Sequence, residues 1–141
     1  MKNSAIVIAS ALVVSVAVGC GGSSGGSSDS PTAPSSASLT GTWNGSFSST
    51  ATGIGTAVIT LVQTGSSVTG TWSVVDGTGV PDSGTATGTV SGAGVSLTLT
   101  PPNPLYCPYS VTATFSSTTL SGTWSTINCT VSVSGTLSLT R

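Results

Sequence analysis

From Leu39 onward, apolar or small residues alternate with Ser or Thr at a period of two, and this pattern constrains the fold more than any other feature. Alternation at this period is typical of β-strands that bury one face. The helical period does not appear at useful length in the same region. The pattern predicts eight strands, at residues 39–48, 54–64, 67–75, 84–91, 94–100, 109–115, 119–125 and 130–140.

The predicted connections alternate in length along the chain. Those after odd-numbered strands are the longer ones, at residues 49–53, 76–83, 101–108 and 126–129. Those after even-numbered strands are tight, at residues 65–66, 92–93 and 116–118, and suit hairpins. If the strands run up and down, all long connections lie at one end.

The scarcity of charged residues predicts that the sheet is closed. Only 4% of the residues are charged, so an open edge strand would have little to protect it from pairing with other chains. We therefore predict an all-β fold, an eight-stranded antiparallel up-and-down barrel in which the last strand pairs with the first. An immunoglobulin-like β-sandwich is the alternative, although the Cys-Trp-Cys spacing of immunoglobulin domains is missing.

A short motif with an aliphatic residue, a glycine and a tryptophan occurs three times, at residues 39–43, 68–72 and 120–124. These positions fall on the first, third and seventh predicted strands, which point the same way. The motif therefore predicts that Trp43, Trp72 and Trp124 gather at a similar height inside the barrel. A glycine next to a tryptophan suits a small barrel, because alternating small and large side chains fill its interior.

Gly41-Thr42-Trp43 resembles the calycin superfamily, in which a Gly-x-Trp lies on the first strand of an eight-stranded barrel. The longer motif looks most like the avidin branch. Lipocalins also pack a basic residue from the last strand over that tryptophan, so the resemblance implies that Arg141 covers Trp43. The polar groups with which avidins hold biotin have no counterparts here, because Asn44 should point outward and the inward-facing set has no acid. The resemblance therefore implies the barrel and not biotin binding.

The resemblance to lipocalin-like lipoproteins implies that an apolar small ligand binds at the end of the barrel with the long loops. The candidate ligand-binding residues are Trp43, Trp72, Trp124 and Tyr109 inside the barrel and Tyr106 on a mouth loop. In the alternative, these rings fill the barrel completely. The domain is then a structural or protein-interaction module of the cell envelope, and the sequence does not identify its protein partner.

The N-terminus predicts export. Lys2 and the apolar run over residues 5–18 have the organisation of a signal peptide. Ala17-Val18-Gly19-Cys20 resembles the lipobox of bacterial lipoproteins, with Ala17 where that family prefers Leu. The resemblance implies a signal peptide at 1–19 and lipidation of Cys20, which anchors the chain to the membrane. Gly21, rather than Asp, implies the outer membrane in a Gram-negative host. An ordinary signal cleaved nearby and an uncleaved anchor are the alternatives.

Residues 20–37 comprise this cysteine and a Gly/Ser-rich linker with a root-mean-square reach of roughly 20 to 25 Å. Residues 38–141 form the predicted barrel domain. Three cysteines are an odd number, and lipidation of Cys20 leaves Cys107 and Cys129 as a pair. Because both fall in predicted long connections at one end, we expect a disulfide between them. Two buried free thiols are the alternative.

The ionisable residues exclude several functions. The bases are Lys2 and Arg141, too few to neutralise phosphates, so nucleic-acid binding is excluded. Histidine is absent from the sequence and no serine has a base, so we expect no enzyme activity and no cofactor. Asp76 and Asp82 flank the Gly-rich segment DGTGVPD, but two carboxylates without further ligands are typical of a solvated turn, so we expect no metal site.

Overall fold

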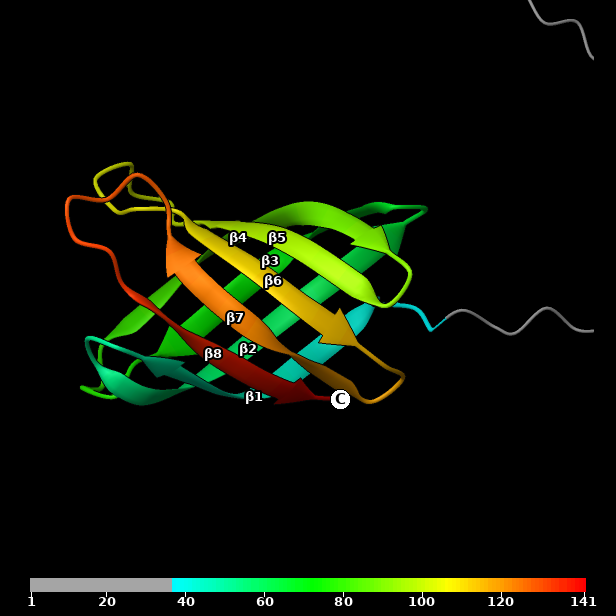
Figure 1. Ribbon diagram of the computed structural model, residues 1–141, viewed down its shortest axis with the longest axis horizontal. Coiled ribbons are helices and arrows are strands. Elements are labelled where there is room, and N and C mark those ends of the chain that lie inside the picture. Colours follow the sequence, from blue (N-terminus) through cyan, green and yellow to red (C-terminus); the bar gives the residue numbers. More distant parts are fainter. Residues whose placement is uncertain (1–36) are drawn as a thin grey trace, which may run out of the picture. The chain divides into compact units, whose positions relative to one another are not determined.

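Eight strands form a closed antiparallel barrel in the computed structural model, which describes residues 37–141 (Figure 1). Each strand pairs with its neighbours in sequence, and the last pairs with the first. The all-β barrel prediction is confirmed, and the sandwich alternative is wrong. The strands are β1 (Gly41–Ser49), β2 (Gly53–Thr64), β3 (Ser67–Val75), β4 (Pro81–Ser91), β5 (Gly94–Thr100), β6 (Tyr109–Phe115), β7 (Thr119–Thr126) and β8 (Ser134–Thr140).

The predicted signal peptide, Cys20 and all of the linker except residue 37 lie outside the described residues. Within residues 37–141, no helix is long and apolar enough to cross a bilayer.

The ends of the barrel differ as the connection lengths predict (Figure 1). Connections 50–52, 76–80, 101–108 and 127–133 lie at one end, which we call the mouth. The tight turns 65–66, 92–93 and 116–118 lie at the other, which we call the closed end. The start of the described chain, drawn in cyan in Figure 1, lies at the closed end, and so does Arg141.

The first strand begins two residues later than predicted, at Gly41. Gly41 has a φ of 145°, a conformation that favours glycine, and the chain before it leaves the sheet. Leu39 instead folds in under the barrel, where its side chain is fully buried. Its N–H donates to the Gln63 side-chain oxygen at 2.9 Å. Leu39 therefore plugs the closed end rather than extending β1.

Three other strand starts differ from the prediction, and of these β2 begins only one residue early, at Gly53. β4 begins at Pro81, three residues early, because the turn formed by residues 76–80 is tighter than expected and pairing with β3 resumes sooner. β8 begins at Ser134 rather than Thr130. Thr126 and Val133 pair with each other and so close the residues between them into a loop. Cys129 in this loop is bonded to Cys107 in the 101–108 connection. Val131, which has the parity of the inward-facing Leu137 and Leu139, is 69% exposed.

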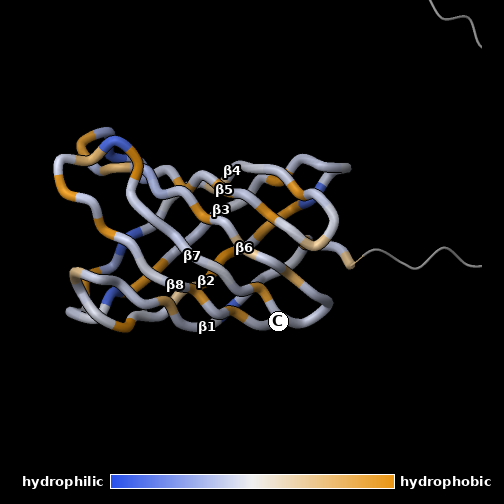
Figure 2. The backbone as a smooth tube through the Cα atoms, in the orientation of Figure 1, coloured by the Kyte–Doolittle hydropathy of each residue, from blue (hydrophilic) through white to orange (hydrophobic). Residues whose placement is uncertain are grey.

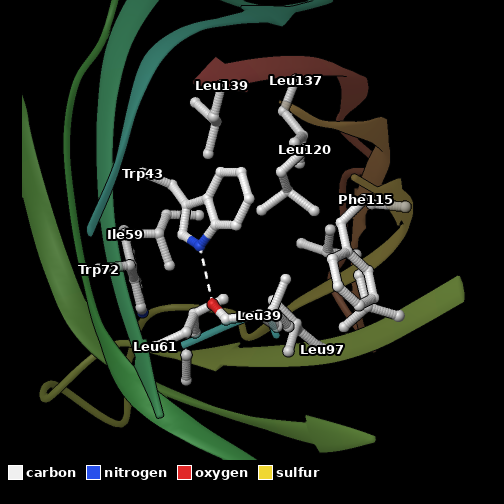
Figure 3. Close-up of a cluster of buried hydrophobic side chains, with 14 of the residues drawn as sticks. Leu39, Trp43, Ile59, Leu61, Trp72, Leu97, Phe115, Leu120, Leu137 and Leu139 are labelled. Atoms are coloured by element: carbon white, nitrogen blue, oxygen red, sulfur yellow. Dashed lines mark hydrogen bonds between the residues drawn. The ribbon is translucent and has the colours of Figure 1, made fainter. Parts of the chain in front are cut away.

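The closed half of the barrel is filled around Trp43, which is fully buried (Figure 3). Its indole Nε1–H donates to the Leu39 carbonyl oxygen at 2.9 Å. The Arg141 guanidinium lies over the same ring, as the calycin resemblance implies. Hydrophobic positions alternate with neutral or polar ones along the strands (Figure 2), and the inward set forms the core. Its other fully buried large side chains are Leu61, Val68, Leu120 and Leu139.

Glycines lie directly opposite two of the tryptophans. Trp72 pairs with Gly84 across β3 and β4, and Trp124 pairs with Gly135 across β7 and β8. A Cβ atom added to either glycine would lie 2.9 Å from the neighbouring indole nitrogen. The small and large alternation predicted from the repeated motif is therefore present between strands, and it is also present within β3, where Gly70 lies between Val68 and Trp72 on the inward face.

Candidate functional site

A cavity of about 640 Å³ occupies the mouth half of the barrel. Small-molecule sites typically have volumes of about 300 to 1,000 Å³. The barrel is therefore filled at the closed end and hollow at the mouth. Aromatic rings and buried aliphatic side chains line the cavity, chiefly Phe47, Ile59, Trp72, Leu99, Tyr109, Val111, Trp124 and Leu139, with Val80, Leu105, Tyr106 and Val131 at the rim.

Tyr109, the first residue of β6, lies between two indoles on the cavity wall. Its ring centroid is 5.6 Å from that of Trp72 and 5.7 Å from that of Trp124, with interplanar angles of 88° and 83°. Phe47 extends the row, with its ring centroid 6.1 Å from that of Trp124. Edge-to-face pairs of this kind are favourable beyond their buried area. The aromatic wall is therefore held in place by its own contacts.

The polar hydrogens on this wall are already donated to protein acceptors. Trp72 Nε1–H donates to the Thr85 carbonyl oxygen at 3.1 Å. Trp124 Nε1–H donates to the Ser48 carbonyl oxygen at 2.9 Å. Both indoles therefore offer the cavity their carbon surface and no free N–H group.

The Asp82 side chain places a carboxylate on the aromatic wall. It is the second residue of β4 and faces inward, half-buried. Its Oδ2 accepts a hydrogen bond from the Tyr109 hydroxyl at 3.1 Å, and its Oδ1 accepts one from the Ser83 N–H at 2.8 Å. Burial, and to a smaller extent the charge and hydrogen bond of Asp82, raise the pKa of Tyr109 to about 12. Tyr109 is therefore a neutral donor at physiological pH.

The expectation that the inward-facing set has no acid is wrong. Asp82 falls in the predicted connection 76–83, whereas the early start of β4 puts this residue on the strand. The signal was present, because Asp82 shares parity with Gly84 and Ala86, both on the inner face. Phe47, also missed, shares parity with Trp43 on β1 in the same way.

Four of the five predicted ligand-binding residues line the cavity. Trp72, Trp124 and Tyr109 meet on its wall, and Tyr106 lies at the rim with 59% of its surface exposed. Trp43 does not line it, so the prediction that the three indoles share one height is wrong. Trp43 is the third residue of its strand, whereas the other two are the sixth of theirs, and odd strands start at the closed end.

The predicted disulfide between Cys107 and Cys129 is confirmed. It joins the two longest mouth connections, with the Cα atoms 5.9 Å apart, and both cysteines line the cavity. Leu105 lies on the same tied connection and is 86% exposed, and the sequence contains no pattern that could have identified it.

Charge is divided between the two ends of the described barrel. Within residues 37–141 the charged side chains are Asp76, Asp82 and Arg141. Both carboxylates lie at the mouth, and the guanidinium lies at the closed end. Asp76 forms its own turn, as predicted, where Oδ1 accepts hydrogen bonds from the Thr78 hydroxyl at 2.7 Å and the Val80 N–H at 2.9 Å. These hydrogen bonds lower the pKa of Asp76.

Comparisons with known proteins find similarity in structure alone. No family model matches the chain, and no curated protein matches it. The structure of EF1p2_mFAP2b bound to DFHBI aligns with a TM-score of 0.64 and 16% identity, covering 73% of this chain and 93% of that one. A redesigned β-barrel, mFAP1, bound to DFHBI aligns with a TM-score of 0.61 and 20% identity, covering 73% and 94%. What the chain shares with both is the fold.

Proposed function

We propose that this protein binds an apolar small molecule in the mouth cavity. The observation that carries the proposal is a cavity of about 640 Å³ whose aromatic wall has donated its polar hydrogens to the protein. Burying an apolar ligand against such a wall is favourable, because apolar surface is removed from water. It leaves no indole N–H group unpaired when the ligand displaces water. The site is largely pre-formed, so a ligand need not order it.

Two further observations support binding at the mouth. Leu105, Tyr106 and Val131 expose apolar surface around the opening, where an entering ligand would first make contact. Two barrels of the same fold, EF1p2_mFAP2b and mFAP1, are bound to DFHBI, so the architecture can accommodate a ligand.

Titration of the purified full-length chain with N-phenyl-1-naphthylamine, a neutral probe whose emission rises in apolar surroundings, tests the proposal. We expect saturable emission. Val74→Trp should fill the cavity and weaken binding by at least ~10-fold, since Val74 lines it. Val75→Trp is the matched control, because Val75 is the next residue of β3, points outward and is 41% exposed. Equal affinity in the two variants would place the probe elsewhere. Failure of the unmodified protein to bind would favour the interaction-module alternative.

We also propose that the barrel works while attached to a membrane through a lipid on Cys20. The lipobox resemblance supports this, and so does the start of the described chain, which lies at the end of the barrel opposite the mouth. Metabolic labelling with an alkyne fatty acid should tag the protein in bacterial membranes, in the outer membrane of a Gram-negative host. Cys20→Ser should abolish both the label and membrane fractionation. Retained labelling in that variant would contradict the proposal.

A further inference from the structure

We infer that the ligand of this cavity is an organic cation, a small molecule with an ammonium group on an apolar or aromatic body. This inference rests on the proposed function and adds the charge of the ligand to it. The relationship that carries it is the position of the Asp82 carboxylate within an aromatic wall.

The first step is the charge of the mouth. The cavity is lined by Asp82 and Asp76, and within residues 37–141 the single cationic side chain, Arg141, is at the opposite end. No basic residue lines the cavity, so the negative charge of Asp82 is not balanced by a cationic side chain there. A negative, partly desolvated mouth attracts cations and repels anions.

The second step is the balance of donors and acceptors. A carboxylate offers about four lone-pair sites, and the Tyr109 hydroxyl and Ser83 N–H occupy two of those on Asp82. The Tyr109 hydroxyl, Trp72 Nε1–H and Trp124 Nε1–H are all donated within the protein. A ligand at this wall therefore meets free acceptor sites and no free donor from the three rings. An ammonium group satisfies that arrangement, whereas an anion does not.

The third step is the position of the rings. The Tyr109 hydroxyl touches Asp82, and the Tyr109 ring is 5.6 Å from that of Trp72. A cation held by the carboxylate would lie beside aromatic π-systems, which attract organic cations most strongly where water is excluded. The apolar body of the ligand would then extend toward Trp124 and Phe47 along the same wall.

The test compares two probes of the same shape. Benzylammonium carries a positive charge and N–H donors, and ethylbenzene is its neutral carbon isostere. Each is titrated into the purified full-length chain while tryptophan emission is followed. We expect the cation to bind at least ~10-fold more tightly than the isostere. Because exposed charges are screened by salt, the preference should decrease as ionic strength rises.

Two variants assign the preference to one carboxylate. Asp82→Asn should remove most of the preference, measured as the ratio of the affinity for the cation to the affinity for the isostere. Asp76→Asn is the matched control, since its carboxylate is also at the mouth but is held within its own turn, and it should keep the preference. Asp82→Glu keeps the charge and should keep a measurable preference, which separates loss of charge from misfolding.

The outcomes distinguish this inference from the proposed function. Equal affinity for cation and isostere, or a preference that survives in Asp82→Asn, would overturn the cationic ligand while leaving an apolar site in place. Binding of neither probe, together with failure of N-phenyl-1-naphthylamine to bind, would overturn the proposed function itself.

Discussion

The Arg141 guanidinium carbon lies 4.4 Å from the centroid of the Trp43 ring. The same side chain donates from Nη1 to the Thr40 carbonyl oxygen at 2.8 Å and from Nε to the Ser117 carbonyl oxygen at 2.7 Å. It thus connects the residues before β1 with the turn between β6 and β7, next to the seam where β8 meets β1. That seam is the barrel's shortest ladder, since β8 pairs with β1 only over residues 44–47.

Arg141→Ala should destabilise the barrel by removing a cation–π contact and two hydrogen bonds. We expect the free energy of unfolding to fall by about 1 to 2 kcal/mol, a modest loss because the side chain is solvent-exposed. Urea denaturation measures it. Arg141→Lys keeps the charge and should lose less. Ligand affinity should not change in the folded protein, because the cavity is at the other end, and a change would contradict this division of roles.

Gly122→Ala should destabilise the barrel more strongly. A Cβ atom at this position would overlap the Thr112 carbonyl oxygen and lie 2.6 Å from the Ala113 Cβ, so β6 would have to move. We expect a loss of about 2 to 3 kcal/mol in the free energy of unfolding. Gly94→Ala is the control, because its nearest neighbour would be the Ser91 carbonyl oxygen at 3.3 Å. Similar losses in both variants would show that the close approach of β6 and β7 at Gly122 is not the cause.

Replacing both Cys107 and Cys129 with Ser should lower the free energy of unfolding by about 3 kcal/mol, since the disulfide closes a loop with a sequence separation of 22. Denaturation with and without a reductant measures the same effect in the unmodified protein. We also expect weaker probe binding, because both tied connections border the cavity. Unchanged binding would show that the rim does not need the crosslink.

Tyr109 should titrate at about pH 12, against an ordinary value of 10.0. Its raised pKa stabilises the folded state below about pH 10, and this contribution should be lost as the pH rises to about 12. NMR of ¹³C-labelled tyrosine in a Tyr106→Phe background gives the value. Asp82→Asn should lower the pKa yet leave it above 10.0, because burial is the larger cause. A pKa unchanged by that substitution would contradict the hydrogen bond.

Much of the fold could be predicted because most inward positions on the strands are apolar or small and most outward positions are Ser or Thr. β3, β5 and β6 match their predicted bounds to the residue. Alternation determines which residues face inward, and turn chemistry determines where pairing resumes. Asp76 shows the limit, because its side chain closes a turn from within and so brings Asp82 onto β4.

The site could be predicted only in part. Local pattern placed Trp72 and Trp124 on inward positions, but their height depends on how far along each strand they lie, and the start of β1 was misplaced by two residues. Trp43 consequently belongs to the core. Whether inward side chains fill a barrel depends on packing in three dimensions, so the hollow at the mouth could not be predicted from periodicity.

The start of the described chain and the C-terminus leave the barrel at the same end, away from the opening (Figure 1). A fusion partner, dye or immobilising tag added at either position would therefore sit far from the four loops. Those loops could be varied in a library without changing the attachment site. Because the attachment site and the cavity lie at opposite ends, the barrel is a candidate scaffold for engineered sensors.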